Sequence, residues 1–137
     1  MSHDDFNKKL IEEFRANEGK VSGMFENTPL LILTTKGGKT GLPREHALAY
    51  STDGDRLVVI ASKGRAPTNP NWYHNLVANP DVTVEVGRDK FQARAIVTEG
   101  DERQRLFDNQ AAKMPGFADY QRKTTRILPV IALERVG

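Results

Sequence analysis

The sequence predicts an α+β fold, in which a small, mostly antiparallel β-barrel is flanked by helices. Two observations carry this prediction. Short apolar or alternating segments follow one another through tight turns, and no helix separates the first three of them as a parallel crossover would require. Helical patterns before, between and after these segments supply the flanking helices. Five or six such strands are enough for a curled sheet with helices across its mouth or side.

The chain is expected to begin with an amphipathic helix over residues 4–17. Phe6, Leu10, Ile11 and Phe14 recur at helical spacing and share one face, while charged residues occupy the other faces. Such a face usually packs on the core of its own protein. Its two other uses would be to cover a substrate entrance or to touch a membrane surface.

Three strands joined by tight turns are expected next, at residues 30–35, 44–50 and 56–62. If these strands pair in succession as hairpins, the first turn and the loop after the third strand leave the same end of the sheet. That arrangement would bring two basic clusters together, with Lys39 and Arg44 in one and Lys63 and Arg65 in the other.

A helix over residues 70–78 follows, with Asn69 as its cap and Pro70 at its first position. Its adjacent aromatic residues, Trp72 and Tyr73, point about 100° apart, so one can pack inward while the other faces a ligand. Trp72 is interpreted either as a core anchor or as the wall of a binding site. Asn71 and Asn75 flank it and could bond the polar edges of a ring.

The last third of the chain alternates strands and helices. Two hairpin strands are expected at 82–86 and 90–97, and a final strand at 127–134. Thr98 and Asp101 resemble a capping box for a helix that runs to about residue 113. A break at Met114-Pro-Gly116 precedes one or two further helical turns.

Composition limits the functions that the chain can have. With 137 residues it has the length of one domain. It has no cysteine, which excludes disulfides, zinc–cysteine sites and cysteine nucleophiles, and its three histidines lack the spacing of a metal site. The N-terminus has no apolar signal segment, so we expect a cytoplasmic protein. A net charge of +2 is too small to indicate a nucleic-acid partner.

Charge is nevertheless concentrated in the middle of the chain, where residues 27–80 have six Lys or Arg and three Asp or Glu. The glycine-rich segment 37–41 is not a phosphate-binding loop of the NTPase type, because Leu33 stands where that motif needs glycine and a strand follows it instead of a helix. Two basic clusters beside the start of a helix are typical of a site for a phosphate or carboxylate. The alternative interpretation is that they are solvated charges on turns.

Three segments resemble the F-420-dependent nitroreductase family, also called the A-type deazaflavin-dependent oxidoreductases. They are LILTTKGGKTGLPR at 31–44, DGDRLVVIASKGRAPTNPNWYHNLVANPDVTVEV at 53–86 and PGFADYQRKTTRILPVIALE at 115–134. The resemblance implies a split β-barrel of the FMN-binding split-barrel type. It assigns residues 28–137 to that barrel and residues 1–27 to an N-terminal helix and lead-in.

The resemblance also implies a site for coenzyme F-420, an anionic deazaflavin with a phosphodiester and an oligoglutamate tail. Lys39, Arg44 and Lys63 would hold the anionic groups, while Trp72 and the strand at Ile60 would wall the ring. The full set of implied coenzyme contacts is Gly38, Lys39, Thr40, Arg44, Glu45, His46, Ala47, Leu48, Ala49, Ile60, Ala61, Ser62, Lys63, Asn71, Trp72, Tyr73, His74 and Asn75.

The acceptor side is implied to include Met114, Phe117 and Tyr120, with the Tyr120 hydroxyl as a proton donor or substrate contact. Members that reduce nitroimidazoles carry tyrosines where this chain has Ala49, Met114 and Phe117. We therefore expect slow turnover of bulky nitro compounds and measurable reduction of enones or quinones.

The resulting hypothesis is a reductase that transfers a hydride from reduced F-420, a diffusible cosubstrate, to an electron-poor small molecule. The expected protein is a monomer without a metal, with weak membrane-surface contact through its N-terminal helix as the one further partner. Two alternatives stay open: an FMN- or haem-binding protein of the same fold, and a non-catalytic F-420 carrier.

Overall fold

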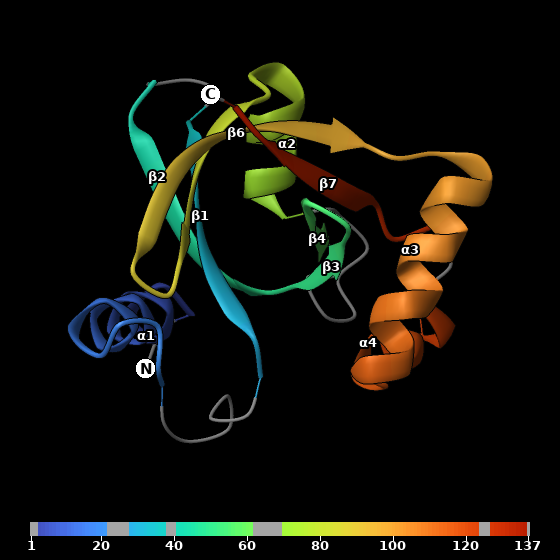
Figure 1. The fold of residues 1–137 in the computed structure, drawn as a ribbon, viewed down its shortest axis with the longest axis horizontal. Coiled ribbons are helices and arrows are strands. Elements are labelled where there is room, and N and C mark those ends of the chain that lie inside the picture. Colours follow the sequence, from blue (N-terminus) through green and yellow to red (C-terminus); the bar gives the residue numbers. More distant parts are fainter. Residues whose placement is uncertain (1–2, 22–27, 38–40, 62–69, 124–126, 137) are drawn as a thin grey trace.

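The computed structural model describes residues 3–21, 28–37, 41–61, 70–123 and 127–136, with side chains from residue 7 onward. Its helices are α1 (His3–Ala16), α2 (Asn71–Ala78), α3 (Gly100–Lys113) and α4 (Gly116–Arg122). Its strands are β1 (Leu30–Lys36), β2 (Pro43–Ala49), β3 (Ser51–Asp53), β4 (Arg56–Ile60), β5 (Asp81–Val86), β6 (Asp89–Val97) and β7 (Val130–Arg135). Figure 1 shows these elements along the chain.

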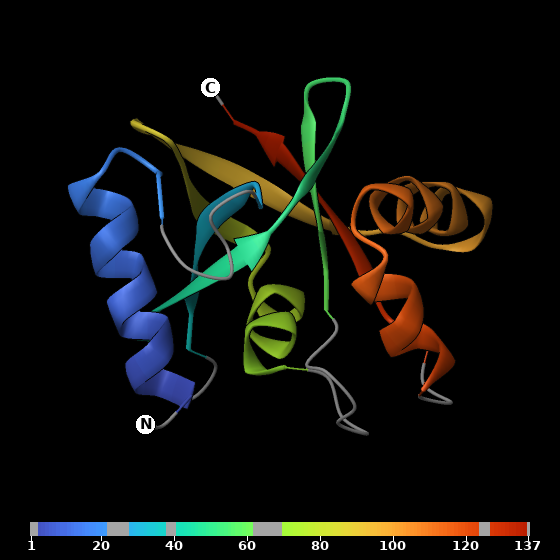
Figure 2. The same cartoon turned by 90° about the horizontal axis from the view of Figure 1, so that it is seen from below.

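The strands form one antiparallel sheet in the order β2-β1-β5-β6-β7-β4-β3. The two ends of this order, β2 and β3, are neighbours in the chain and are separated only by Tyr50. A chain can join both edges of one sheet through a single residue only if the sheet curls round on itself (Figures 1 and 2). The predicted curled antiparallel sheet with flanking helices is therefore confirmed.

The predicted succession of hairpins is wrong at its second step. β1 and β2 form a hairpin, with Leu30 opposite Ala49 and Lys36 opposite Pro43. β2 does not return along β4, however. At Tyr50 the chain crosses to the other edge of the curled sheet, where β3 pairs with β4 and Ser51 lies opposite Val58. The other side of β4 is occupied by β7.

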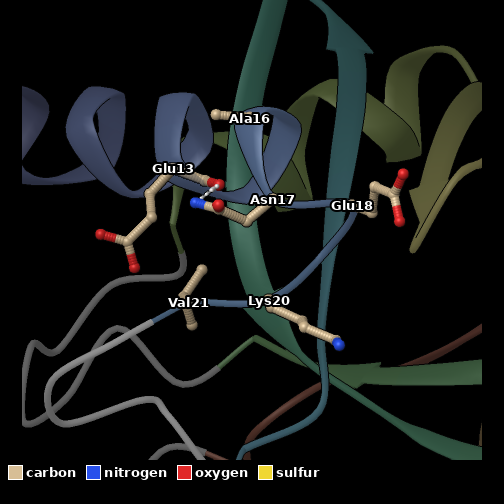
Figure 3. A pocket seen from close by; sticks show the side chains of 6 residues that line it. All are labelled: Glu13, Ala16, Asn17, Glu18, Lys20 and Val21. Carbon is tan, nitrogen blue, oxygen red and sulfur yellow. Dashed lines mark hydrogen bonds between the residues drawn. The ribbon is translucent and has the colours of Figure 1, made fainter.

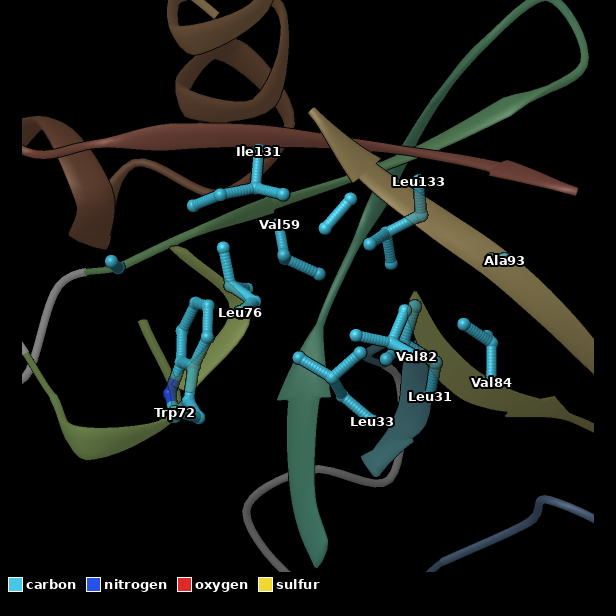
Figure 4. Packing of buried hydrophobic residues seen from close by; sticks show 12 residues of the cluster. Leu31, Leu33, Val59, Trp72, Leu76, Val82, Val84, Ala93, Ile131 and Leu133 are labelled. Carbon is cyan, nitrogen blue, oxygen red and sulfur yellow. The ribbon is translucent and has the colours of Figure 1, made fainter. Parts of the chain in front are cut away.

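Side-chain alternation along the strands sorts the core into three layers, because successive residues of a strand point to opposite faces. The layer inside the curl is covered by α2 and includes Leu33, Val59, Trp72 and Leu76 (Figure 4). A second layer lies between the sheet and α3, and it takes Val58, Ile60, Leu106, Phe107, Leu128 and Val130. A third lies between the sheet and α1, and it takes Ile11, Phe14, Val21, Leu30 and Ile32.

Helix α1 packs its apolar face on the outside of the sheet, beside β2, as predicted for a core-packed helix. Phe14 is 1% exposed and Ile11 is 5% exposed. The Asn7 amide donates to the Glu45 carbonyl at 2.9 Å and accepts from the Ala47 N–H at 3.0 Å, which satisfies backbone groups on the open edge of β2. Among the described residues, no helix combines the length and the apolar character needed to cross a membrane.

The starts of two helices differ from the prediction. α2 begins at Asn71 with Pro70 in the capping position, so Pro70 lies one place earlier than expected, and Asn69 is outside the described residues. α3 begins at Gly100, and the predicted capping box at its start is wrong. The Thr98 hydroxyl instead donates to the Val130 carbonyl at 2.8 Å and ties the end of β6 to β7, because this buried group finds a closer acceptor across the sheet.

A group of charges joins the β3–β4 turn to α3. The Asp53 carboxylate accepts from Arg105 at 2.9 Å and from Arg56 at 2.6 Å, and Arg56 also reaches Glu102 at 3.2 Å. Hydrogen bonds from Arg105, the larger cause, and from Arg56 lower the pKa of Asp53 to about 2. The carboxylate form is therefore favoured by folding.

Replacing Asp53 with asparagine is expected to flatten the acid end of the pH–stability profile. A carboxyl group whose pKa is lower in the folded state contributes stability above its unfolded pKa of about 4, and that contribution is lost as the pH falls toward about 2. Urea denaturation midpoints between pH 2 and pH 7 test this. Asp55→Asn, in the same turn and without a described ion pair, is the matched control. Parallel profiles for wild type and Asp53→Asn would contradict the prediction.

Candidate functional site

The inner face of β2 brings together predicted coenzyme residues from β2 and α2. Arg44 lies opposite Thr35 in the β1–β2 hairpin, so both side chains belong to one face of the sheet. The Thr35 hydroxyl, which is 2% exposed, accepts from the Asn75 amide of α2 at 3.2 Å. Arg44 therefore lies on the face that α2 covers. His46 and Leu48 follow Arg44 at intervals of two residues along β2, so their side chains lie on the same face.

Helix α2 contributes two kinds of residue to this face. Trp72 is 4% exposed, and its indole lies beside Leu76 and Val59 inside the curl (Figure 4). Tyr73 is half-buried against the same cluster and meets the His74 ring edge-on, with ring centroids 5.5 Å apart. His74 and Asn71 are exposed. The helix thus anchors itself through Trp72 and presents polar groups beside Arg44.

The outer face of β2 serves to hold α1. Ala47 and Ala49 pack in the layer beneath this helix. The Glu45 carboxylate binds Arg15, which also donates to Glu85 at 2.7 Å and 3.1 Å. Hydrogen bonds to Glu85, the larger cause, and to Glu45 raise the pKa of the Arg15 guanidinium, so it stays charged. Its charge is compensated within the fold by the two carboxylates. These contacts give Glu45, Ala47 and Ala49 a structural role.

Arg44 differs from Arg15 in having its charge available. It is exposed and makes no ion pair with a carboxylate in the described part of the chain. Lys36, next along β1 from Thr35, is also exposed and unpaired among those residues. The turn end of the β1–β2 hairpin therefore carries two cations, Arg44 on the face that α2 covers and Lys36 on the opposite face. Arg44 is the one placed to meet an anionic ligand beside α2.

The predicted acceptor residue Phe117 lies on the α3 side of β4, opposite the face that α2 covers. Phe117 of α4 packs on the layer that contains Ile60, one of the predicted coenzyme contacts. Tyr120 is 39% exposed and meets the Phe117 ring edge-on, with centroids 6.2 Å apart. The fold therefore brings Ile60, Phe117 and Tyr120 into one neighbourhood, although Ile60 and Tyr120 are 60 residues apart in the chain.

A pocket of about 380 Å³ adjoins this neighbourhood. Its volume lies within the range of about 300–1,000 Å³ that is usual for small-molecule sites. We call it the bend pocket, because the bend between β2 and β3 forms one wall and the α3–α4 turn forms another. It is lined by Thr28, Pro29, Tyr50, Ser51, Thr52, Lys113, Met114, Pro115 and Gly116.

Two other hollows flank α1. One of about 470 Å³ lies between α1 and the start of β2, and its lining includes three predicted residues, Arg44, Glu45 and His46. The other, of about 500 Å³, lies at the end of α1 and is lined by Glu13, Ala16, Asn17, Glu18, Lys20 and Val21 (Figure 3). None of the residues that line this second hollow was predicted to bind coenzyme or acceptor.

Five predicted coenzyme residues fall outside the described residues, namely Gly38, Lys39, Thr40, Ser62 and Lys63. Ala61 is described, is fully buried and belongs to the inner layer with Trp72. The structure thus brings the β2 and α2 parts of the predicted site together, and the convergence of the two basic clusters stays a prediction.

Sequence reasoning missed the residues that complete the bend pocket, above all Tyr50, Ser51 and Lys113. A signal existed for Lys113, because it directly precedes Met114, which the resemblance placed on the acceptor side. No comparable signal marked Ser51, whose position at the sheet edge depends on the crossing at Tyr50.

Comparison with known proteins gives a consistent result. The family model of F420H(2)-dependent quinone reductase matches residues 7–135. An F420H(2)-dependent quinone reductase of Mycobacterium tuberculosis is 37% identical over 129 residues, which is 89% of this chain and 85% of the relative.

Solved structures agree with the family model. A structure described as an F420-H2 dependent reductase has a TM-score of 0.72 and 36% identity, and the match covers 77% of this chain and 94% of that one. A structure described as a domain-swapped dimer has a TM-score of 0.74 and 32% identity, over 97% and 100% of the two chains.

More distant structures share the fold alone, with identities of 14–18% and TM-scores of 0.57–0.65, and their descriptions include a pyridoxamine 5′-phosphate oxidase and a haem storage protein. The predicted split β-barrel is thereby confirmed. Since the family model spans nearly the whole sequence and the mycobacterial relative exceeds a third identity, this chain belongs to the F420H(2)-dependent quinone reductase family.

Proposed function

We propose that this protein is an oxidoreductase that uses reduced coenzyme F-420 to reduce an electron-poor small molecule, with a quinone as the acceptor class that fits best. The observation that carries the proposal is the family match over residues 7–135, which includes both β2 and α4. The reduced deazaflavin supplies a hydride when it is bound. The protein supplies binding, orientation and a site partly shielded from water.

The described residues fit an anionic coenzyme. Arg44 offers an unpaired guanidinium at the turn end of the β1–β2 hairpin. Half-buried groups on the same face, His46, Leu48 and Tyr73, add polar and apolar surface beside it. A guanidinium can hold a phosphate or a carboxylate through two parallel hydrogen bonds. Arg44 would therefore bind the anionic part of the coenzyme, and the neighbouring surface would orient the rest.

Parallel fluorescence titrations with F-420 and FMN test the coenzyme assignment. F-420 is expected to bind at least ten times more tightly than FMN. Its phosphodiester and oligoglutamate tail carry several negative charges that can reach Arg44 at the turn end of the β1–β2 hairpin. Binding of FMN ten times more tightly than F-420 would favour the alternative of an FMN-binding protein of the same fold. Oxidation of reduced F-420 only when a quinone is added would separate an enzyme from a carrier.

Tyr120→Phe is expected to lower turnover with little change in F-420 affinity. Tyr120 on α4 is 39% exposed and its ring contacts Phe117, so the side chain can reach a substrate without belonging to the core. A positioned proton donor contributes roughly 10²–10⁴-fold to rate, so a loss of tenfold or more would assign it that role. Steady-state kinetics with a quinone and an enone measure the effect. Unchanged turnover with both acceptors would remove Tyr120 from the mechanism.

The oligomeric state and membrane contact are also proposals. We propose a monomer, although one solved relative is described as a domain-swapped dimer. The face of α1 that could touch a membrane is used here to cover β1 and β2, which favours weak or no contact. Light scattering after size-exclusion chromatography and a vesicle sedimentation assay measure these two properties.

A further inference from the structure

The bend pocket adjoins predicted coenzyme contacts on β2 and β4. Tyr50 directly follows Ala49, and Ser51 lies opposite Val58, two residues before Ile60. On the other wall, Met114 and Gly116 precede Phe117, which packs on the layer of Ile60. A small molecule in this pocket would therefore lie beside Ala49 and near Ile60, two of the residues that the resemblance assigns to the coenzyme.

The walls of the pocket are held in place by buried hydrogen bonds. The Ser51 hydroxyl donates to the Gln110 side-chain oxygen at 2.8 Å, and both residues are buried. The Gln110 carbonyl also accepts from the Met114 N–H at 2.8 Å, at the end of α3. One residue thus fixes the β3 wall and the α3–α4 wall relative to each other. A site on rigid elements orients a ligand more accurately than one on free loops.

The pocket is cationic. Among the lining residues in the described part of the chain, Lys113 is the one that carries a charge, and no described carboxylate pairs with it. The nearest acid along the sheet edge, Asp53, is already bound by Arg56 and Arg105. Gln110 lies behind the wall and does not line the pocket; its buried Nε2 donor has no acceptor among the described residues. Tyr50 and Met114 supply flat and apolar surface.

We propose that the bend pocket receives the electron acceptor and that Lys113 makes it selective for quinones with an anionic group, such as a sulfonate, a carboxylate or an ionised hydroxyl. This inference rests on the proposed function. In the reaction, one hydride and one proton leave the reduced coenzyme, and the quinone takes up both equivalents to become a hydroquinone. Negative charge that develops on the quinone oxygens is stabilised by the same ammonium group.

The test compares neutral 2-methyl-1,4-naphthoquinone with anionic 1,4-naphthoquinone-2-sulfonate. Lys113→Gln is expected to raise KM for the sulfonate about fivefold, the value of a partly exposed ion pair, and to leave KM for reduced F-420 unchanged. KM for the neutral quinone should change less than twofold. Lys113→Arg should restore the preference, and Lys90→Gln, on β6, is the control that should change nothing.

Calorimetry of the sulfonate binding to the protein without coenzyme separates this inference from the proposed function. Lys113→Gln and added salt should both weaken that binding. If wild type reduces both quinones and Lys113→Gln alters neither KM nor binding, the inference is overturned and the proposed function stands. If wild type oxidises reduced F-420 with neither of the two quinones, the proposed function fails. Binding of the sulfonate that depends on Lys113 would still support an anion site in the pocket.

Discussion

Trp72→Ala is expected to lower the free energy of unfolding by about 3–5 kcal/mol, which is the usual cost of removing a large aromatic side chain from a core. Trp72 is 4% exposed and packs in the layer inside the curl, with Leu76 from its own helix and Val59 from β4. Its loss would leave a cavity between α2 and the sheet. Because this is the only tryptophan of the chain, urea denaturation should be followed by circular dichroism.

Trp72→Phe separates the core role of this residue from its predicted role as a wall for the coenzyme ring. Phenylalanine keeps an apolar ring in the same place, so more than half of the stability lost in the alanine variant should be retained. F-420 affinity should also be retained, because a wall needs only apolar surface. A variant with wild-type stability and an F-420 affinity weakened tenfold would contradict the core role.

The elements that build the core could be predicted from local patterns, and alternation within each strand then divides its residues between the layers. In β4, Val58 and Ile60 face α3, while Val59 faces the inside of the curl, as a period of two requires. The spacing of Ile11 and Phe14 likewise predicted the buried face of α1. In each case, a pattern within ten residues determines which side chains are buried.

Features that depend on contacts between distant segments could not be predicted in this way. The crossing at Tyr50 joins two sheet edges that are defined only once β7 has paired with β4. Arg15 lies 30 residues from Glu45 and 70 residues from Glu85, and its ion pair with Glu45 is what lets Glu45 help to hold α1. Lys113 resembles any lysine in the last turn of a helix until the bend at Ser51 is placed beside it.

Arg44→Ala is expected to weaken F-420 binding by roughly tenfold to a hundredfold. A hydrogen bond to a charged group is worth about 1.5–3 kcal/mol when it is partly shielded from water, and this range converts to the stated loss. The free energy of unfolding should hardly change, because Arg44 is exposed and makes no ion pair with a described carboxylate. Fluorescence titration gives the affinity, and urea denaturation gives the stability.

The salt dependence of binding identifies the cause of that loss. If Arg44 contacts an anionic group of the coenzyme, wild-type affinity should fall as salt rises, and Arg44→Ala should show a shallower fall because one charge contact is missing. Arg44→Lys keeps the charge but not the planar two-donor geometry, so its affinity should lie between the two. Lys90→Ala, on the β5–β6 hairpin, is the matched control. Equal affinities for Arg44→Ala and Lys90→Ala would mean that Arg44 is only a solvated charge and that the coenzyme lies on another face of β2.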